Sequence, residues 1–425
     1  MSNSLPVDNI REEFDAAITG DVPVIVTAPT GSGKSTRIPL WLDEEFDGPI
    51  LVVEPRRVAC RSLAEWLSQQ RGEQPGESIG YTVRFDDSTS DETSVVFATT
   101  GVALKMLDTE QEWPFAAVMI DEFHERSWQV DLILAAVRNR RTDGEDLPLV
   151  ITSATLDDDE LERELDATLL EATGRTYPVD VSYTDEPRAP TGRDLDDRVR
   201  DAVEQTLRDD PEGDILVFLP GKGEIADCDS ALGAIRDDYN FESVQVHGSL
   251  PPHEMASALG DSEHRRRVYL STNVAETSLT LPGVTTVNDS GLVRMRIHRG
   301  GRSALALVPI AEDSMDQRAG RAGRVQPGRC IRLWNERFRA SDTTPPELER
   351  IELDDVMLHA ALCGIEADDF SKAPWITEPP EFAVEQARQR LIDVGAFDAD
   401  GYLTDKGRTL AELPVDGHDA RLLVG

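Results

Sequence analysis

Short apolar runs alternate along this chain with longer stretches of mixed polarity, and this pattern predicts strands alternating with helices. The runs of a first series lie at 22–26, 49–53, 95–98, 116–120 and 149–151. Those of a second series lie at 215–219, 244–246 and 268–270. Each run has the length of a buried strand. Strand–helix alternation predicts an α/β fold with parallel sheets, and two series of similar rhythm predict two such domains.

The rest of the chain divides at changes of pattern. Residues 156–213 are acidic and carry several glycines and prolines, which predicts a domain boundary at 174–180. Two apolar stretches separated by paired glycines predict a β-hairpin at 291–308. Beyond it the pattern becomes helical, with a small β-wing expected at 398–404, as in a winged-helix domain. We therefore expect domains at 1–174, at 175–342 with the hairpin 291–308, and at 343–409.

The charge balance bears on partners more than on the fold. The chain carries 81 Asp and Glu against 43 Lys and Arg, a formal net charge of −38. Only five of the basic residues are Lys, so the other 38 are Arg, and the acidic residues are dispersed along the whole chain. Dispersed acid with little lysine is typical of a halophile's protein in a salty cytoplasm. The alternative is an acidic protein that avoids nucleic acid, and composition alone does not decide between them.

Cysteine usage and hydropathy exclude other classes of protein. The four cysteines, Cys60, Cys228, Cys330 and Cys363, are scattered without paired spacing. This argues against a disulfide framework or a structural zinc and for a reducing, cytoplasmic setting. No apolar run approaches the ~18 residues of a membrane-spanning helix, so we expect no membrane partner.

Residues 28–36, with the sequence APTGSGKST, predict a phosphate-binding loop between a strand and a helix. Gly31 and Gly33 allow backbone N–H groups to close on an anion at a helix N-terminus. Lys34 would reach the β- and γ-phosphates, and the Ser35 hydroxyl would hold Mg²⁺. The strict pattern begins with glycine where this chain has alanine, and an ordinary glycine-rich turn is the alternative. The residues expected to bind the nucleotide are Thr30, Gly31, Ser32, Gly33, Lys34, Ser35 and Thr36.

Asp121 and Glu122 directly follow a predicted buried strand. The carboxyl ends of parallel strands meet at one edge of a sheet, which would bring this pair near the phosphate-binding loop. Asp121 would hold Mg²⁺ through water, and Glu122 would orient and deprotonate an attacking water. An Asp-Glu pair alone is weak evidence in so acidic a chain. Its position directly after a predicted strand is what supports the assignment of Asp121 and Glu122 to these roles.

Arginines and hydroxyls elsewhere are candidates for phosphate contacts. Arg56 and Arg57 follow one predicted strand, and Thr99 follows another. A plain turn at the start of a helix is the alternative for the arginine pair. Arg321 and Arg324 are three positions apart, which predicts one helix face and suits arginine fingers on a polyphosphate. A solvated or nucleic-acid-binding Arg-Gly segment is the alternative there.

Taken in order, these stretches resemble the motifs of the DEAH-box helicases of superfamily 2. The resemblance is nearest to the bacterial HrpB type of ATP-dependent RNA helicase, which has Phe where the name of the box has Ala. The matching stretches are TGSGKS at 30–35, EPRR at 54–57, DEFHER at 121–126, SAT at 153–155, FLPG at 218–221, TNVAETSLT at 272–280 and QRAGRAGR at 317–324. One such motif would be weak, but seven in family order are specific.

The resemblance implies two RecA-like P-loop domains in tandem, a winged-helix domain, and at 410–425 the start of a helical domain. It implies ATP and Mg²⁺ between the two lobes and single-stranded RNA across them. His124 would couple to Gln317, and Ser153 and Thr155 would link hydrolysis to movement of the lobes. The implied catalytic residues are Lys34, Asp121, Glu122, His124, Gln317, Arg321 and Arg324. The implied contacts to the nucleic-acid backbone are Arg56, Arg57, Thr99, Gly221, Thr272 and Thr277.

Two other functions stay open at this point. A DNA-directed motor of the same superfamily would use the same backbone contacts, because these do not read the sugar. A non-catalytic scaffold that binds nucleotide without turnover is the other. Chains of the HrpB type continue well past residue 425, so we expect the helical domain to be cut short here. Protein partners are not predicted.

Overall fold

A computed structural model of the chain describes residues 5–29, 31–109, 113–154, 159–173, 177–209, 212–260, 265–276, 281, 283–299, 302–324 and 326–413. The chain forms two compact units. The first comprises residues 1–174, 298–303 and 345–425, and the second comprises residues 175–297 and 304–344. No helix within the described ranges is both long and apolar enough to cross a membrane.

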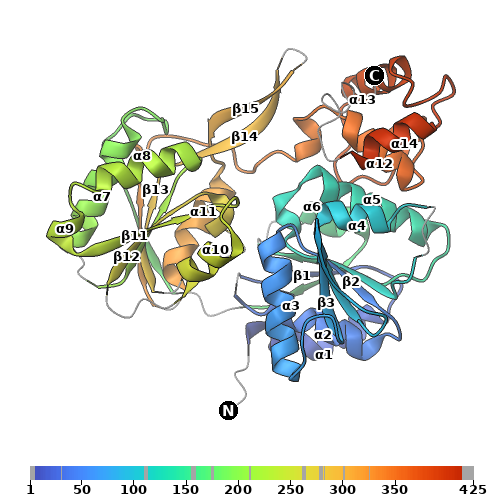
Figure 1. Cartoon of the computed structure of the whole chain (residues 1–425), viewed down its shortest axis with the longest axis horizontal. Helices are drawn as coiled ribbons and strands as arrows, with labels where there is room; N and C mark the ends of the chain where they lie inside the picture. The colour runs from blue at the N-terminus through green and yellow to red at the C-terminus, as the bar shows by residue number, and fades with distance from the viewer. Residues whose placement is uncertain are drawn as a thin grey trace. The chain divides into compact units, whose positions relative to one another are not determined.

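The first unit is built on a sheet of eight strands (Figure 1). The strands are β1 (Val24–Thr27), β2 (Ile50–Val53), β3 (Ile79–Val83), β4 (Asp86–Ser88), β5 (Val95–Ala98), β6 (Ala117–Ile120), β7 (Leu149–Ser153) and β8 (Thr168–Glu171). Their order across the sheet is β4-β3-β5-β2-β6-β7-β1-β8. All neighbours are parallel except β3 and β4. The five predicted strands are all present, and β3, β4 and β8 add to them at the two edges.

Helices cover both faces of this sheet, and strand residues alternate between them. One face packs on α1 (Arg11–Ile18), α2 (Lys34–Glu45) and α3 (Arg57–Arg71), and the other on α4 (Thr100–Met106) and α5 (Trp128–Thr142). The short η1 (Pro6–Ile10), η2 (Phe123–Glu125) and α6 (Asp159–Leu165) complete this part of the chain. Val24 and Val26 of β1 face the first layer, and Ile25 between them faces the second. The sequence of β1 thus contributes to both hydrophobic cores.

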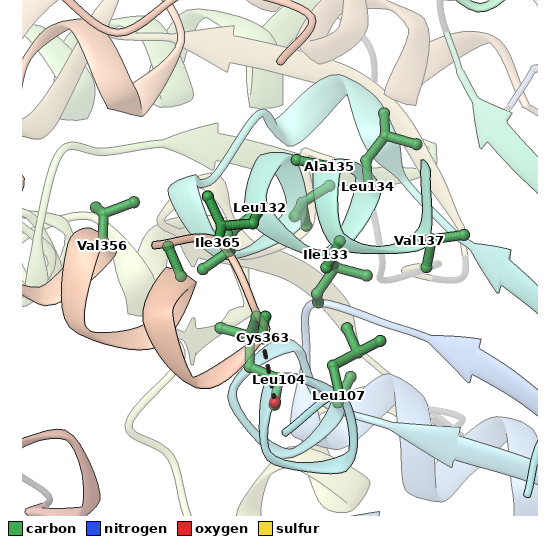
Figure 2. Packing of buried hydrophobic residues seen from close by; sticks show 14 of the residues in the cluster. Leu104, Leu107, Leu132, Ile133, Leu134, Ala135, Val137, Val356, Cys363 and Ile365 are labelled. Carbon is green, nitrogen blue, oxygen red and sulfur yellow. Dashed lines mark hydrogen bonds between the residues drawn. The ribbon is translucent and has the colours of Figure 1, made fainter. Parts of the chain in front are cut away.

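The segment predicted to be a winged-helix domain packs on α4 and α5 and belongs to the first unit. Its elements are η5 (Glu347–Glu349), α12 (Asp354–Leu362), η6 (Phe370–Lys372), α13 (Glu381–Asp393) and α14 (Asp405–Glu412). The expected wing is reduced to one antiparallel bridge between Phe397 and Leu403. Figure 2 shows α12 and the residues after it against α4 and α5, with the Cys363 thiol 4.0 Å from the Leu104 carbonyl oxygen.

The second unit has a six-stranded parallel sheet in the order β11-β12-β10-β13-β16-β9. The strands are β9 (Val179–Tyr183), β10 (Asp214–Phe218), β11 (Phe241–Val246), β12 (Arg266–Ser271), β13 (Val284–Asp289) and β16 (Gly328–Arg332). Its helical elements are α7 (Leu195–Asp209), α8 (Lys222–Leu232), α9 (Arg236–Tyr239), α10 (Pro252–Leu259), η3 (Asn273–Ala275), α11 (Glu312–Gly320) and η4 (Arg321–Gly323). The hairpin is present as β14 (Leu292–Arg299) and β15 (Arg302–Pro309) (Figure 1). The prediction of two parallel α/β domains in tandem is therefore confirmed.

Candidate functional site

The loop between β1 and α2 has the backbone that its glycines permit. Gly31 has a φ of +83° and Gly33 a φ of +99°, in the left-handed region that other residues avoid. Ser32 between them is buried, and the Thr36 hydroxyl donates to the Gly33 carbonyl at 3.1 Å. The loop leads straight into the N-terminus of α2, where the helix dipole favours an anion. Thr30 lies outside the described residues.

Lys34, the first residue of α2, turns its ammonium group back onto this loop. Its Nζ donates to the carbonyl oxygen of Ala28 and, at 3.4 Å, to that of Pro29. The residue is only 4% exposed, so its charge lies within the loop and not on the surface. A phosphate oxygen in the loop would meet an ammonium group already in place.

Asp121 directly follows β6, is fully buried and lies beside the first turn of α2. The hydroxyl of Thr152 donates to its carboxylate, and the hydroxyl of Ser35 lies beside it. Burial raises the pKa of Asp121, and the neighbouring Glu122 raises it further, while the two hydroxyls and Lys34 oppose the shift. Such a carboxylate is a good partner for a cation, because a positive charge would bring its pKa down.

The residues at this point fit Mg²⁺. A serine hydroxyl and a carboxylate oxygen lie side by side at Ser35 and Asp121, and Mg²⁺ takes oxygen ligands. In the part of the chain that the structure describes, no group of three or more His, Cys, Asp or Glu side chains could hold a metal. Mg²⁺ typically binds through one or two protein groups and completes its shell with water and substrate phosphates.

Glu122 begins a tight turn directly after Asp121. Its N–H donates to Oδ1 of Asp121 at 3.0 Å, and its side chain is nearly buried, with the residue 6% exposed. Nδ1 of His124 lies 3.5 Å from Oε2 of Glu122. The same nitrogen accepts from the N–H of Ala154, just past β7, at 3.4 Å. The predicted base therefore has a histidine beside it that is itself joined to the end of a neighbouring strand.

The end of β7 connects with the phosphate-binding loop as well. Ser153 is fully buried, and its carbonyl accepts from the N–H of Ala28 at 3.2 Å. With the contact between Ala154 and His124, this strand end bonds to both the loop and the turn that begins at Glu122. The coupling role of Ser153 stays a prediction that this geometry suits, and Thr155 lies outside the described residues.

Glu54, at the end of β2, adds a carboxylate that was not among the candidates. It is 2% exposed, and burial raises its pKa well above the ordinary range, with further contributions from Asp121, Glu122 and Glu125. Arg56 opposes this shift and forms an ion pair with Glu125, with Nη2 and Oε1 2.7 Å apart. The place of Glu54 directly after a buried strand is the signal that could have identified it.

The remaining candidates for nucleic-acid contact lie at the carboxyl ends of neighbouring strands. In the first unit, Arg57 is exposed after β2 and Thr99 follows β5. In the second unit, Gly221 and Thr272 follow β10 and β12, which are also neighbours. Each set is placed as a backbone-contacting set would need to be, and Thr277 lies outside the described residues.

The arginines predicted as fingers lie where α11 gives way to η4. Arg321 begins this 3-10 turn, so a tighter turn carries it and Arg324, and not the α-helical face expected from their spacing. Arg321 is buried and its guanidinium donates to the carbonyl of Glu276. Gln317 and Arg324 are half-buried. The predicted action of these residues on the nucleotide, and of Gln317 on His124, joins the two units and stays a prediction.

Arg318, between these candidates, is the largest charged group that sequence reasoning missed. It is 1% exposed, and its Nε and Nη1 donate to Glu276 and Asp289 at 2.8 and 2.9 Å. Its guanidinium carbon lies 4.9 Å from the centre of the Phe218 ring. Arg318 therefore ties α11 to the ends of β10 and β13, and to the motif that contains Glu276.

Three families of known domains match the chain in the order of its segments. The DEAD/DEAH box helicase family matches residues 10–163. The helicase conserved C-terminal domain matches residues 198–326, and the winged-helix helicase associated domain (HA2) matches residues 387–415. With the two parallel sheets, these matches confirm two RecA-like domains in tandem followed by a winged-helix region.

Individual proteins resemble the chain over nearly its whole length. It is 35% identical to the ATP-dependent RNA helicase HrpA of Escherichia coli (strain K12), over 99% of this chain and 33% of that protein. A crystal structure of the Escherichia coli DEAH/RHA helicase HrpB matches it with a TM-score of 0.90 and 33% identity, over 99% of this chain and 54% of the other. A structure described as the E. coli DExH-box NTPase HrpB gives a TM-score of 0.87 at 33% identity, over 100% and 53%. The chain thus spans a third to about half of the length of these relatives.

Proposed function

Because this chain belongs to the DEAH-box helicases of superfamily 2, we propose that it hydrolyses ATP to move along single-stranded RNA or to unwind nucleic acid. One observation carries the proposal. The ends of β1, β6 and β7 bring Lys34, Asp121 and Glu122 together around one phosphate-binding loop. The relatives named as RNA helicase and NTPase support the same activity.

The residues of the first unit would divide the work as follows. The backbone of the loop and Lys34 bind the β- and γ-phosphates. Ser35 and Asp121 would hold Mg²⁺, which neutralises charge that develops on the phosphates. Glu122 orients a water for in-line attack on the γ-phosphorus and accepts its proton as the bond to the β-phosphate oxygen breaks. His124 lies beside Glu122, with Nδ1 3.5 Å from Oε2.

The second unit would supply the residues that complete the site. Arg321 and Arg324 are proposed to stabilise charge on the γ-phosphate, in the manner of arginine fingers. Gln317 would meet His124, and Ser153 with Thr155 would pass the state of the nucleotide to the second unit. The buried Arg318 supports this arrangement, because it fixes α11 on the strands that carry Asp289 and Phe218.

RNA would lie across the carboxyl ends of the strands and be held by its backbone. The proposed contacts are Arg56, Arg57, Thr99, Gly221, Thr272 and Thr277. Contacts of this kind do not read bases, which suits a motor that must act on any sequence. The relative HrpA is described as an RNA helicase, which favours RNA over DNA as the proposed substrate. We also propose that the acidic surface adapts the protein to a salty cytoplasm, in which its four free and buried cysteines stay reduced.

The test is ATP turnover with and without oligonucleotides. Glu122→Gln should still bind ATP while hydrolysis falls at least ~10²-fold, the usual contribution of a general base. Glu145→Gln is the matched control, because Glu145 is exposed in the loop after α5 and pairs with Arg140. Stimulation by RNA and not DNA supports the RNA motor, and the reverse supports the DNA motor. Tight ATP binding without turnover in the unaltered protein would instead support the alternative of a non-catalytic scaffold that binds nucleotide.

A further inference from the structure

The turn that carries Glu122 has an unusual backbone at both ends. Glu122 has a φ of +52° and Arg126 a φ of +44°, in the region that residues with side chains avoid. The N–H of Glu125 donates to the Glu122 carbonyl at 3.1 Å. The N–H of Arg126 donates to the Phe123 carbonyl at 3.0 Å. A backbone of this kind persists only where the surroundings hold it.

The side chain of Arg126 holds the far end of the turn on two elements. Its Nε donates to Oδ1 of Asp131 at 2.9 Å, and its Nη2 donates to the hydroxyl of Thr377 at 2.9 Å. Its guanidinium carbon also lies 5.2 Å from the centre of the Phe123 ring. Asp131 is a buried residue of α5, whereas Thr377 comes from the winged-helix segment, 251 positions along the chain. One planar group therefore joins the catalytic turn to both.

The backbone of the turn is bonded to the winged-helix segment a second time. The N–H of Glu347 donates to the carbonyl of Arg126 at 3.1 Å. The carboxylate of Glu347 accepts from the N–H of Trp128, the first residue of α5, at 3.1 Å. Negative charge at this end of a helix is favourable, so Glu347 fixes the start of α5 and the end of the turn together.

The winged-helix segment is itself packed firmly enough to act as a support. Its α12 shares one hydrophobic core with α4 and α5, and Figure 2 shows Val356, Cys363 and Ile365 among the leucines of those helices. The N–H of Thr109, beyond α4, donates to the carbonyl of Leu362 at 3.0 Å. Packed interiors have low compressibility and transmit displacements to their neighbours.

We propose that Arg126 is a positioning residue for the base Glu122, and that it works by anchoring the catalytic turn to Thr377 and Glu347 of the winged-helix segment. This rests on the proposed ATP hydrolysis and adds that the winged-helix segment sets the rate of the chemical step. A displacement of about 1 Å in a catalytic group costs on the order of 10² in rate. Loosening the anchor should therefore lower kcat and leave KM for ATP unchanged, because the nucleotide-binding loop is not part of it.

Two substitutions loosen the anchor and keep the turn foldable. Thr377→Val removes one hydroxyl and leaves the pair of Arg126 with Asp131 intact. Arg126→Lys keeps a charge beside Asp131 but loses the planar fork that donates in two fixed directions. The matched control is Arg408→Ala, which breaks an ion pair of α14 with Asp108, 3.2 Å long, in the same interface but away from the turn.

Steady-state kinetics give the first readout. We expect kcat to fall about 3- to 10-fold in Thr377→Val and about 10-fold or more in Arg126→Lys, with KM for ATP within about twofold of the unaltered protein. Arg408→Ala should keep kcat. Full kcat in both turn variants overturns the proposal, and so does an equal loss in Arg408→Ala, which would mean that general docking matters and not the anchor.

Hydrogen exchange gives a readout that does not need activity. The amides of Glu125 and Arg126 should exchange faster in Thr377→Val and in Arg126→Lys than in the unaltered protein, and at the normal rate in Arg408→Ala. If the unaltered protein hydrolyses no ATP, the proposed function fails while the exchange still decides whether the turn is anchored. Unchanged exchange in both turn variants refutes the anchor.

Discussion

Replacing Arg318 with methionine tests how much its buried ion pairs stabilise the second domain. In the structure Arg318 is 1% exposed and donates to Glu276 at 2.8 Å and to Asp289 at 2.9 Å. Asp289 is fully buried, and burial raises its pKa even with the arginine beside it. Methionine fills much of the same space but leaves the two carboxylates without their cation.

The size of the effect follows from these contacts. A hydrogen bond to a charged group contributes about 1.5–3 kcal/mol, and Arg318 makes two of them to carboxylates. Removing one partner of a buried ion pair typically costs about 3–5 kcal/mol, because the other charge stays buried. We therefore expect Arg318→Met to lower the free energy of unfolding of the second domain by about 3–5 kcal/mol near neutral pH. Adding Asp289→Asn should restore part of the lost stability, because it removes the unpaired buried charge. Oδ1 of the amide can still accept from the N–H of Gly291.

Hydrogen exchange of strand amides measures the loss of stability separately in each domain. A loss of about 3–5 kcal/mol corresponds to exchange roughly 10²- to 10⁴-fold faster in β13, while β6 of the first domain serves as the internal control. Arg200→Met on α7 is the matched variant, because its ion pairs lie at the surface and should not matter. Exchange in β13 that is less than tenfold faster, or no rescue by Asp289→Asn, would refute the reasoning.

Two further predictions concern pH and salt. Burial raises the pKa of Asp131 from 3.8 to about 6, against Arg126 and with help from Glu347. Between these two pKa values, Asp131 keeps a proton in the folded protein that it has lost in the unfolded chain. The free energy of unfolding, measured by urea titration relative to Asp131→Asn, should therefore fall by roughly 2 kcal/mol from pH 4.5 to pH 7. A difference between the two proteins that stays constant with pH would contradict the assignment. RNA-stimulated ATPase activity should rise from dilute buffer to molar KCl, because 81 acidic side chains repel RNA and one another at low salt. Circular dichroism separates folding from binding, and a protein that is folded and most active in dilute buffer would show that the salt adaptation is wrong.

The strands that carry the site could be predicted because the local sequence of each one is enough to identify it as a buried strand. β2, β5 and β6 are continuous apolar runs, as is β10 after its first residue, and a strand buried on both faces needs such a run. The polar residues after them then meet at one edge of the sheet, which is why Lys34 and Asp121 could be placed together from sequence alone. Strands β8 and β9 lie at sheet edges within an acidic stretch, and their partly exposed residues leave no comparable run.

The residues that sequence reasoning missed act through partners far away in the chain. Arg318 is bonded to Glu276 and Asp289, and Arg126 to Thr377, so their roles depend on contacts that no local pattern encodes. A run of arginines and glycines predicts exposure, and the burial of Arg318 comes from the packing of α11 on β13. Only the folded arrangement shows that Arg318 and Arg321, of the three arginines in this run, are buried.

The same contacts suggest why this chain uses 38 Arg and only five Lys. Exposed ion pairs weaken as salt rises, whereas buried and hydrogen-bonded pairs are screened much less. The pairs of Arg56 with Glu125, Arg126 with Asp131, and Arg318 with Asp289 each place a guanidinium against a buried or partly buried carboxylate. An ammonium group could not donate in two fixed directions at once, as Arg126 does between α5 and the winged-helix segment. Lys34 differs because its proposed task is to bring a compact charge to phosphates inside a narrow loop. Among these residues, the choice between Arg and Lys therefore follows the geometry of each contact. Although Arg126→Lys and Arg318→Lys keep the charge, each should lower the free energy of unfolding because the lysine cannot make both hydrogen bonds.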